Sequence, residues 1–283
     1  MEVITLAEPG RLCFEQRADP GRATGTVLLK MKRLGVCGTD LHAYRGRQPY
    51  FRYPRILGHE ICATLEEPLE GFERGELVTV MPYRYCGTCR ACKSGKTNCC
   101  RELSVIGVHE DGGMAGYLRV RQDLVLSGQG LSADALAVAE PFSIAAHALR
   151  RVNLGKDDAI LVIGAGPIGH CLMRLALANG LRTVALERSP ERIIRVGKVK
   201  GVNVLDAGSP ELNKAVEDCS NGQGFDVIFD ATGSLNSIEG ALQYLGHGGT
   251  LVLVGIQQEA FRFSHPDFHR KEATVMALSL IHI

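Results

Sequence analysis

The sequence predicts a mixed α/β protein of two domains, with a β-rich domain over residues 1–151 and a doubly wound parallel-sheet domain over residues 152–283. Three observations support this prediction. Before residue 151, glycine or proline interrupts short strand-like segments about every dozen residues, which is typical of an irregular β-rich domain. After Ala159, apolar runs alternate with helical stretches, which indicates βαβ units and a parallel sheet. A glycine-rich turn directly follows the first of these runs.

The expected elements follow in chain order. In the first domain, the segments Val27–Met31 and Glu76–Met81 have the composition of strands. The second domain is expected to contain strands at Ala159–Ile163, Thr183–Glu187, Val202–Leu205, Phe225–Asp230 and Thr250–Val254, with helices at His170–Asn179 and Glu191–Lys200. These strands are continuous apolar runs because helices cover both faces of a parallel sheet.

Composition narrows the class of protein. The chain has 283 residues, of which 22% are charged and 45% are hydrophobic, and its formal net charge is +1. This balance, without long runs of one sign, gives no field that attracts nucleic acid, so no nucleic-acid partner is expected. No apolar run reaches the length of a membrane span, and the first residues lack the basic and apolar regions of a signal peptide. We therefore expect a cytoplasmic protein with no membrane partner.

The ten cysteines are unevenly distributed. Five of them lie within residues 86–100, and such clustering is typical of metal binding in a reducing compartment rather than of disulfide bonds. Four others have mostly apolar or small neighbours and are expected to be small buried side chains: Cys13, Cys62, Cys171 and Cys219.

The strongest motif is the spacing Cys86-x2-Cys89-x2-Cys92-x7-Cys100. Zn²⁺ takes four thiolates in a closed tetrahedron, and two-residue gaps let a looping backbone aim successive sulfurs at one point. No position would remain open for a substrate, so this zinc ion is expected to be structural. Cys99 is a nearly equivalent alternative to Cys100. A set of free surface thiols is the competing interpretation, which is disfavoured because exposed thiols this close together would oxidise.

A second group of potential metal ligands is spread along the first domain. Cys37 supplies a thiol, His59 and Glu60 are adjacent, and Glu140 lies near the end of the domain. Cysteine, histidine and a carboxylate are the ingredients of an open zinc site that keeps one position for water or substrate. Asp40 can accept the second N–H of His59 and fix its tautomer. A single cysteine or histidine is more often packed than ligating, so the hypothesis depends on the whole set.

The glycine-rich turn predicts a dinucleotide site, because it has the pattern Gly-x-Gly-x-x-Gly between a strand and a helix. Its glycines let the backbone approach a pyrophosphate at the helix N-terminus. Glu187 ends the next strand, where it would bind the adenosine ribose and repel a 2′-phosphate, which favours NAD over NADP. The adjacent Arg188 is the residue type that a 2′-phosphate attracts. A glycine turn without a ligand is the alternative. The candidate cofactor-binding residues are Gly164, Gly166, Pro167, Ile168, Gly169, Glu187 and Arg188.

With these three motifs in this order, the chain resembles the zinc-dependent medium-chain dehydrogenase/reductase family over essentially its whole length. The resemblance is nearest to the branch of polyol, threonine and sugar-acid dehydrogenases. The segments Gly46–Phe51 and Gly107–Gly113 look like the subgroup that acts on sugar acids such as L-galactonate. The resemblance implies a GroES-like β domain followed by a Rossmann domain, with NAD(P) and a catalytic zinc ion in the cleft between them.

The resemblance also implies roles for individual residues. Cys37 and His59 match catalytic zinc ligands, and Glu60 matches a carboxylate that ligates or closely neighbours the metal. Glu140 matches a glutamate that reaches the zinc directly or through water. A glutamate there favours the polyol-type branch, because the alcohol-dehydrogenase branch has a cysteine at this position.

The implied reaction is the oxidation of a secondary alcohol of a polyol or sugar acid to a ketone. Zinc lowers the pKa of the alcohol as a Lewis acid, and hydride passes to the nicotinamide of NAD. Thr39 can pass the released proton through a hydroxyl relay, via the ribose of the cofactor, to His42, whose ordinary pKa suits release to water. A packed or exposed His42 without a catalytic role is the alternative.

Members of this family continue for several dozen residues beyond the last Rossmann strand, whereas the likeness here fades after Met276. We therefore expect a C-terminally truncated member whose last seven residues are atypical, and a homodimer or homotetramer in full-length form. A half-built domain would expose apolar surface, so a non-catalytic zinc- and dinucleotide-binding protein or metabolite sensor is the alternative to an enzyme. A zinc-free quinone reductase is disfavoured by the intact set of Cys37, His59 and Glu60.

Overall fold

The computed structural model describes residues 1–279, and residues 280–283, which include part of the atypical C-terminal segment, lie outside the described residues. The chain divides into two compact units, one formed by Met1–Glu140 and one that begins at Pro141. This division falls inside helix α4 (Ala139–Arg150). The alternation of strands and helices begins later, at β11 (Ala159–Ile163), and the domain limits 1–151 and 152–283 stay a prediction.

The first unit is built mainly from short strands. Its elements are β1 (Glu2–Glu8), β2 (Arg11–Gln16), β3 (Thr26–Gly35), α1 (Gly38–Tyr44), β4 (Arg55–Ile56), β5 (Glu60–Leu65), β6 (Leu77–Val80), β7 (Tyr83–Arg84), α2 (Arg90–Lys93), η1 (Thr97–Cys99), β8 (Ser104–Val105), β9 (Tyr117–Arg121), η2 (Gln122–Leu124), β10 (Val125–Ser127) and α3 (Ala133–Ala137). The two strands expected from the sequence coincide with β3 and β6, so both predictions are confirmed.

Two antiparallel sheets form the body of this unit. The larger has the strand order β10-β6-β5-β3-β9, and the smaller has the order β2-β1-β4. Alternate residues of β3 and β5 point into one core cluster, where Val27, Leu29, Ile61, Ala63 and Leu65 are fully buried. Because side chains alternate between the two faces of a strand, this burial fixes the register of both strands. The loops that follow β3 and precede β5 therefore start from a rigid base.

The second unit alternates strands and helices after α4. Its further elements are β11, α5 (Pro167–Ala178), β12 (Arg182–Glu187), α6 (Pro190–Val196), β13 (Val202–Asp206), α7 (Leu212–Cys219), β14 (Phe225–Asp230), α8 (Leu235–Tyr244), β15 (Leu245–Leu253), α9 (His265–Arg270) and β16 (Thr274–Ala277). Every strand and helix expected here from the sequence is present. The expected helix at Glu191–Lys200 is shorter, because α6 ends before Gly197, a residue of low helix propensity.

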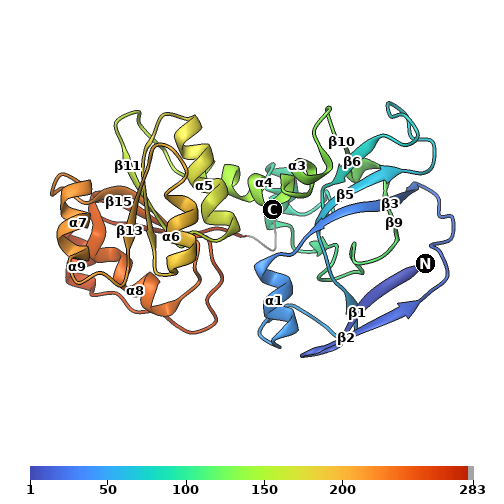
Figure 1. Cartoon of the computed structure of the whole chain (residues 1–283), viewed down its shortest axis with the longest axis horizontal. Coiled ribbons are helices and arrows are strands. Elements are labelled where there is room, and N and C mark those ends of the chain that lie inside the picture. Colours follow the sequence, from blue (N-terminus) through green and yellow to red (C-terminus); the bar gives the residue numbers. More distant parts are fainter. Residues whose placement is uncertain (280–283) are drawn as a thin grey trace. The chain divides into compact units, whose positions relative to one another are not determined.

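Six strands of this unit form one parallel sheet in the order β13-β12-β11-β14-β15-β16. This is the 3-2-1-4-5-6 order of a Rossmann fold, so the predicted doubly wound sheet is confirmed. Figure 1 shows α5 and α6 on one face of the sheet and α7 and α8 on the other, as right-handed crossovers require. The strand order reverses between β11 and β14, and their carboxyl ends therefore mark the crevice where such sheets bind ligands.

Helices on both faces explain the apolar strands of this sheet. All five residues of β11 are buried, and Phe225 and Ile228 of β14 are fully buried in the cluster around it. Among residues 1–279, no helix combines the length and the apolar character needed to cross a membrane.

Candidate metal centres and dinucleotide site

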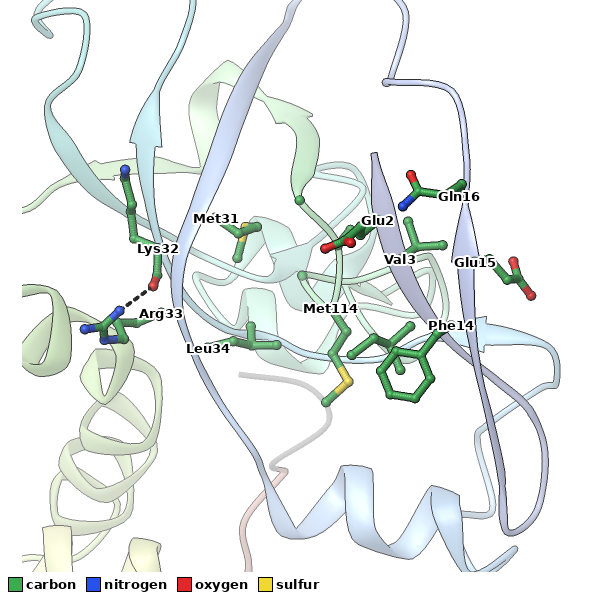
Figure 2. A pocket seen from close by; sticks show the side chains of 14 residues that line it. Glu2, Val3, Phe14, Glu15, Gln16, Met31, Lys32, Arg33, Leu34 and Met114 are labelled. Carbon is green, nitrogen blue, oxygen red and sulfur yellow. Dashed lines mark hydrogen bonds between the residues drawn. The ribbon is translucent and has the colours of Figure 1, made fainter.

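An apolar cavity of about 650 Å³ lies between β3 and the β1–β2 hairpin of the first unit. Figure 2 shows the side chains of Met31, Leu34, Met114 and Phe14 along it. No group of potential metal ligands found among residues 1–279 includes a residue that lines this cavity. The candidate site residues lie elsewhere in the unit.

The four-cysteine motif forms a compact lobe between β7 and β8. The sulfur atoms of Cys86, Cys89, Cys92 and Cys100 all lie within 4.8 Å of one another. The Sγ–Sγ distance is 3.5 Å between Cys89 and Cys92 and 4.0 Å between Cys86 and Cys92. These values bracket the edge of about 3.8 Å that a thiolate tetrahedron around zinc requires. Cys99, the alternative to Cys100, is exposed and does not belong to the group.

Hydrogen bonds give the four thiols unequal acidity. The hydroxyl group and backbone N–H of Thr88, with the N–H of Cys89, lower the pKa of Cys86 to about 6. Burial and the neighbouring Cys89 thiol raise the pKa of Cys92 to about 12. Four thiolates at these distances repel one another unless a cation lies between them. The lobe therefore has both the donor set and the electrostatic demand of a closed zinc site.

The ends of β3 and β5 bring Cys37, His59 and Glu60 together. Cys37 is the N-cap of α1, and Glu60 begins β5 directly after His59. One ligand atom from each of the three lies within 4.8 Å of the others. Gly35 pairs with Glu60 in the β3–β5 ladder, and a Cβ at Gly35 would lie 1.8 Å from Oε2 of Glu60. Glycine at this position therefore leaves the space that the Glu60 carboxylate occupies.

Asp40 faces the imidazole of His59. Its Oδ2 accepts a hydrogen bond of 2.9 Å from the backbone N–H of Cys37, and its Oδ1 lies 3.9 Å from Nδ1 of His59. Both this Oδ1 and this Nδ1 are buried, and neither has a hydrogen-bond partner among the described residues. Such a pair fits the arrangement in which a carboxylate orients a histidine whose other ring nitrogen binds a metal.

Acidic groups surround the His59 ring. Burial alone lowers the pKa of His59, but Cys37, Asp40 and Glu140 outweigh burial and raise this pKa to about 10. Burial and repulsion from Glu140 raise the pKa of Glu60 to about 7. Burial is also the main cause that raises the pKa values of Glu140 and Asp40. A divalent cation would relieve this concentration of acidic groups, and a set of thiol, imidazole and carboxylate fits zinc.

Glu140 lies in α4, where its buried carboxylate accepts a hydrogen bond from the hydroxyl group of Tyr83. It is not one of the three residues whose ligand atoms lie closest together, although its charge acts on His59 and Glu60. The sequence does not reveal a role for Tyr83, because nothing in the local sequence distinguishes this residue from a core tyrosine. Only the packing of β7 beside α4 reveals the contact.

Thr39 and His42 lie three residues apart on α1, so they share one face of this helix. His42 is exposed, and the partial desolvation of its ring, with the charges of Arg45 and Arg47, holds the pKa of His42 below its usual value. The imidazole is therefore neutral at neutral pH and can accept a proton.

The glycine turn that follows β11 has the open backbone expected of a dinucleotide site. Gly164 has a φ of +94°, and a Cβ at Gly169 would lie 1.9 Å from the carbonyl oxygen of Gly164, so both positions require glycine. Gly166 is the N-cap of α5, and a Cβ there would meet nothing within 4 Å. Pro167 begins the helix and is exposed, and Ile168 is half-buried. Exposed backbone at a helix N-terminus is what an approaching pyrophosphate needs.

Glu187 ends β12 with a buried carboxylate beside this turn. Its Oε2 accepts a hydrogen bond of 2.8 Å from the N–H of Ala165, and its Oε1 accepts bonds of 2.8 and 2.9 Å from Arg188 and Ser189. Burial alone raises the pKa of Glu187, but these donors and Arg192 outweigh burial and hold it below its usual value. The carboxylate is therefore ionised, and it ties β12 to the glycine turn. The Arg188 side chain is exposed.

The four remaining cysteines differ in burial. Cys62 and Cys171 are buried, as the sequence predicts. Cys13 and Cys219 are only half-buried, so the prediction is wrong for these two. Cys13 lies on the edge strand β2, and Cys219, the last residue of α7, packs against the core cluster of its unit without being enclosed by it.

Comparison with known proteins gives a consistent result. Residues 23–129 match the family model of the alcohol dehydrogenase GroES-like domain, and residues 167–282 match that of zinc-binding dehydrogenases. The L-galactonate-5-dehydrogenase of Escherichia coli K12 is 40% identical over 98% of this chain and 82% of its own length. An alcohol dehydrogenase of Escherichia coli CFT073, solved with NADH, is 29% identical with a TM-score of 0.88 over 98% of this chain and 82% of its own. A zinc-binding dehydrogenase of Sinorhizobium meliloti 1021, solved with NADP, is 25% identical with a TM-score of 0.88, over 98% of this chain and 83% of its own.

The chain therefore belongs to the zinc-type alcohol dehydrogenase family, and the predicted combination of a GroES-like domain with a Rossmann domain is confirmed. Within that family it belongs to the zinc-type polyol dehydrogenases, and it is an oxidoreductase by membership. These similarities do not test the role of any single residue, so the metal ligands, the relay residues and the cofactor contacts stay predictions.

Proposed function

We propose that this protein is a zinc- and NAD-dependent dehydrogenase that oxidises a secondary hydroxyl group of a polyol or sugar acid to a ketone. The observation that carries the proposal is the convergence of Cys37, His59 and Glu60 within 4.8 Å, backed by the buried and unpartnered carboxylate–imidazole pair of Asp40 and His59. A packing role does not account for this set, because burying unpaired polar atoms costs stability.

Two groups of residues would hold zinc. Cys37, His59 and Glu60, with Glu140 directly or through water, would hold a catalytic ion, and Cys86, Cys89, Cys92 and Cys100 would hold a structural ion. When bound, the catalytic zinc supplies a Lewis acid that lowers the pKa of the substrate hydroxyl group, and bound NAD supplies the hydride acceptor.

The residues of the chain around the catalytic ion have distinct tasks in this proposal. Asp40 orients the His59 ring, and Tyr83 fixes the Glu140 carboxylate through its hydrogen bond. Thr39 would take the proton of the substrate hydroxyl group as the first member of a hydroxyl relay that ends at His42. His42 is neutral at neutral pH, accepts that proton and releases it to water.

The cofactor would bind to the glycine turn of the second unit, where Gly166 leaves open backbone at the N-terminus of α5. The ionised Glu187 beside this turn supports NAD as the preferred cofactor, and so does the NADH of the Escherichia coli CFT073 structure. The exposed Arg188 and the NADP of the Sinorhizobium meliloti structure are the arguments for NADP.

The cysteine chemistry supports a cytoplasmic location for this protein. The four thiols of the lobe need a reducing compartment to stay competent for zinc, and none of them forms a disulfide bond within the described residues. A homodimer or homotetramer stays a prediction for this protein.

The proposal is tested by a screen for NAD⁺ reduction over polyols and sugar acids, with His59→Ala as the site variant. We expect turnover by the wild-type chain, loss of turnover in the variant, and retention of the zinc in the cysteine lobe. A wild-type chain that binds zinc and NAD but oxidises no substrate of either class would contradict the proposal. That result would favour a non-catalytic zinc- and dinucleotide-binding protein.

A further inference from the structure

A second cavity of the first unit has a different lining from the apolar one. It has a volume of about 430 Å³ and lies between the segment that precedes β4 and the loop that follows β8. We call it the arginine pocket, and its lining residues are Pro49, Tyr50, Phe51, Arg52, Arg55, Val108 and His109. This volume is in the range of small-molecule sites, which are typically about 300–1,000 Å³.

The apolar part of the arginine pocket borders the core cluster that contains Tyr83. Phe51 and Val108 are buried in the same core cluster as Tyr83. The hydroxyl group of Tyr83 donates to Glu140, whose charge acts on His59. The pocket and the Tyr83–Glu140 contact therefore border the same core cluster of the first unit.

The polar part of the pocket is cationic. Its lining contains two arginines and no acidic residue. Nη1 of Arg55 donates a hydrogen bond of 3.2 Å to Asp111, which the more distant Arg17 also approaches, at 3.9 Å. Arg17 has a nearer partner in Glu15, at 2.8 Å, so Asp111 mainly compensates Arg55. The positive charge that the pocket leaves uncompensated is that of Arg52.

Both arginines of the lining keep donors that the protein does not use. Nε of Arg55 is buried and has no partner in the part of the chain that the structure describes. Arg52 is exposed and makes no ion pair or hydrogen bond with any of residues 1–279. A guanidinium group presents its donors in a fixed fork that matches a carboxylate or a phosphate.

We propose that the arginine pocket binds the anionic end of the substrate, and that Arg52 and Arg55 determine the preference for an acidic substrate over a neutral polyol. This inference rests on the proposed function, because it assigns the pocket to the substrate of the same site. The anionic group is a carboxylate in a sugar acid and a phosphate in a polyol phosphate. Both groups present the oxygen pair that a guanidinium fork binds.

The test uses the full chain and three probes that differ at one end: L-galactonate, galactitol 1-phosphate and neutral galactitol. Binding is measured by calorimetry and turnover by NAD⁺ reduction, for the wild-type chain and for Arg52→Gln, Arg52→Lys and Arg74→Gln. Arg74 is the matched control, because it is an exposed arginine of the same unit outside the pocket.

We expect the wild-type chain to bind at least one anionic probe about tenfold or more tightly than galactitol, with an affinity that falls as salt is added. Arg52→Gln should lower the affinity ratio of that anion to galactitol by about tenfold, mainly through KM. Arg52→Lys should restore part of the ratio, and Arg74→Gln should leave it unchanged. The anion whose affinity Arg52→Gln lowers more identifies the substrate class as a sugar acid or a polyol phosphate.

The inference is overturned if neither anion binds more tightly than galactitol. It is also overturned if Arg52→Gln changes the affinity for all three probes by the same factor. Turnover of galactitol in that case would leave the proposed function standing while the pocket assignment fails. If an anion binds in an Arg52-dependent manner but no NAD⁺ is reduced, the pocket assignment stands and the proposed function does not.

Discussion

At the scale of single residues, the proposed path of the substrate proton depends on two side chains of α1. Thr39 and His42 share a helix face, and the pKa of His42 lies below its usual value because of the partial desolvation of its ring and the charges of Arg45 and Arg47. A lowered pKa keeps the imidazole available as a proton acceptor over the neutral range, and it stops accepting protons as the pH falls through that lowered value.

We expect His42→Gln to slow alcohol oxidation by up to about 10²-fold at pH values below 7 that lie above the lowered pKa of His42, because the wild-type imidazole is neutral there. The loss should shrink as the pH rises and hydroxide replaces the imidazole. Zinc content should stay unchanged, because His42 does not belong to the ligand group. The measurement is kcat against pH, with zinc determined on the same samples. Loss of zinc would make His42 a support of the metal site instead, and a rate equal to wild type at every pH would exclude the relay.

Glu187 illustrates a residue with two tasks. Its carboxylate already accepts three backbone N–H groups, one of them from Ala165 in the glycine turn, and it is also the proposed ribose ligand. We expect Glu187→Ala to weaken NAD binding by about tenfold or more and to narrow the preference for NAD over NADP. The comparison variant is Arg188→Ala, which should leave NAD affinity near the wild-type value. Unchanged NAD affinity in Glu187→Ala would show that Glu187 does not bind the ribose.

At the scale of elements, the cysteine lobe offers a matched pair of neighbouring residues. Cys100 belongs to the four-sulfur group, whereas Cys99 is exposed and does not. We expect two zinc ions per chain, with the four-thiolate ion the slower to leave because the other site keeps an exchangeable position. Cys100→Ser should release the slow ion and unfold the lobe, and Cys99→Ser should keep both ions. Equal zinc loss in the two variants, measured by metal analysis during chelation, would contradict this assignment.

A bidentate ion pair joins the edge strand β9 to the segment that follows β5. Arg119 donates to both oxygens of Glu67, at 2.8 and 2.9 Å, and Glu67 also accepts a bond of 3.0 Å from the N–H of Leu28 in β3. These contacts lower the pKa of Glu67 to about 2, and the hydrogen bonds from Arg119 have the largest effect. Since the folded-state pKa is depressed, the stabilisation is present above the ordinary pKa of about 4.3 and is lost as the pH falls towards 2.

A double-mutant cycle of Glu67→Gln and Arg119→Met should give a coupling free energy of about 1 kcal/mol at pH 7 and almost none near pH 2. The pair of Arg121 and Asp123 is the comparison, because both side chains are largely exposed and only two residues apart. Its coupling should be near zero. The measurement is urea unfolding at both pH values, and a coupling that does not depend on pH would refute the electrostatic origin.

Features of the fold that depend on local sequence can be predicted from the sequence, whereas features that depend on contacts between distant residues cannot. The parallel strands and the glycine turn are predictable because each depends on local pattern, a continuous apolar run or a glycine that no other residue can replace. The contact between Tyr83 and Glu140 is not predictable, since it joins residues 57 positions apart in the sequence. The arginine pocket is not predictable either, because it combines residues 49–55 with residues 108 and 109, which are distant in sequence.

At the scale of the whole molecule, the proposed metal sites and the proposed cofactor site belong to different units. All the proposed metal ligands lie within Met1–Glu140, and the glycine turn and Glu187 lie in the unit that begins at Pro141. Binding stabilises the folded state that binds, so zinc acts through the first unit and NAD through the second. Metal content and cofactor affinity are therefore independent readouts for variants of either unit.

The metal-free first unit should become less stable as the pH rises, and zinc should remove this trend. Burial and acidic neighbours raise the pKa of Glu60 to about 7, so ionising this group destabilises the fold as the pH rises from about 4.5 to 7. His59 has a pKa raised to about 10 by its acidic neighbours, so the stability that its proton adds is complete below about pH 6.5 and is lost as the pH approaches 10.

Zinc takes the place of these protons, so its binding releases them and its stabilising effect should grow with pH. We expect the difference in Tm between zinc-loaded and metal-free chain to be larger at pH 8.5 than at pH 6, by several degrees, which corresponds to about 1–2 kcal/mol. His59→Ala is the control, because removing the imidazole removes the group whose proton zinc displaces. Since the cysteine lobe keeps its own ion in this variant, the remaining pH dependence measures the four thiols alone. An increment in Tm that is the same at both pH values in the wild-type chain would show that zinc does not bind at Cys37, His59 and Glu60.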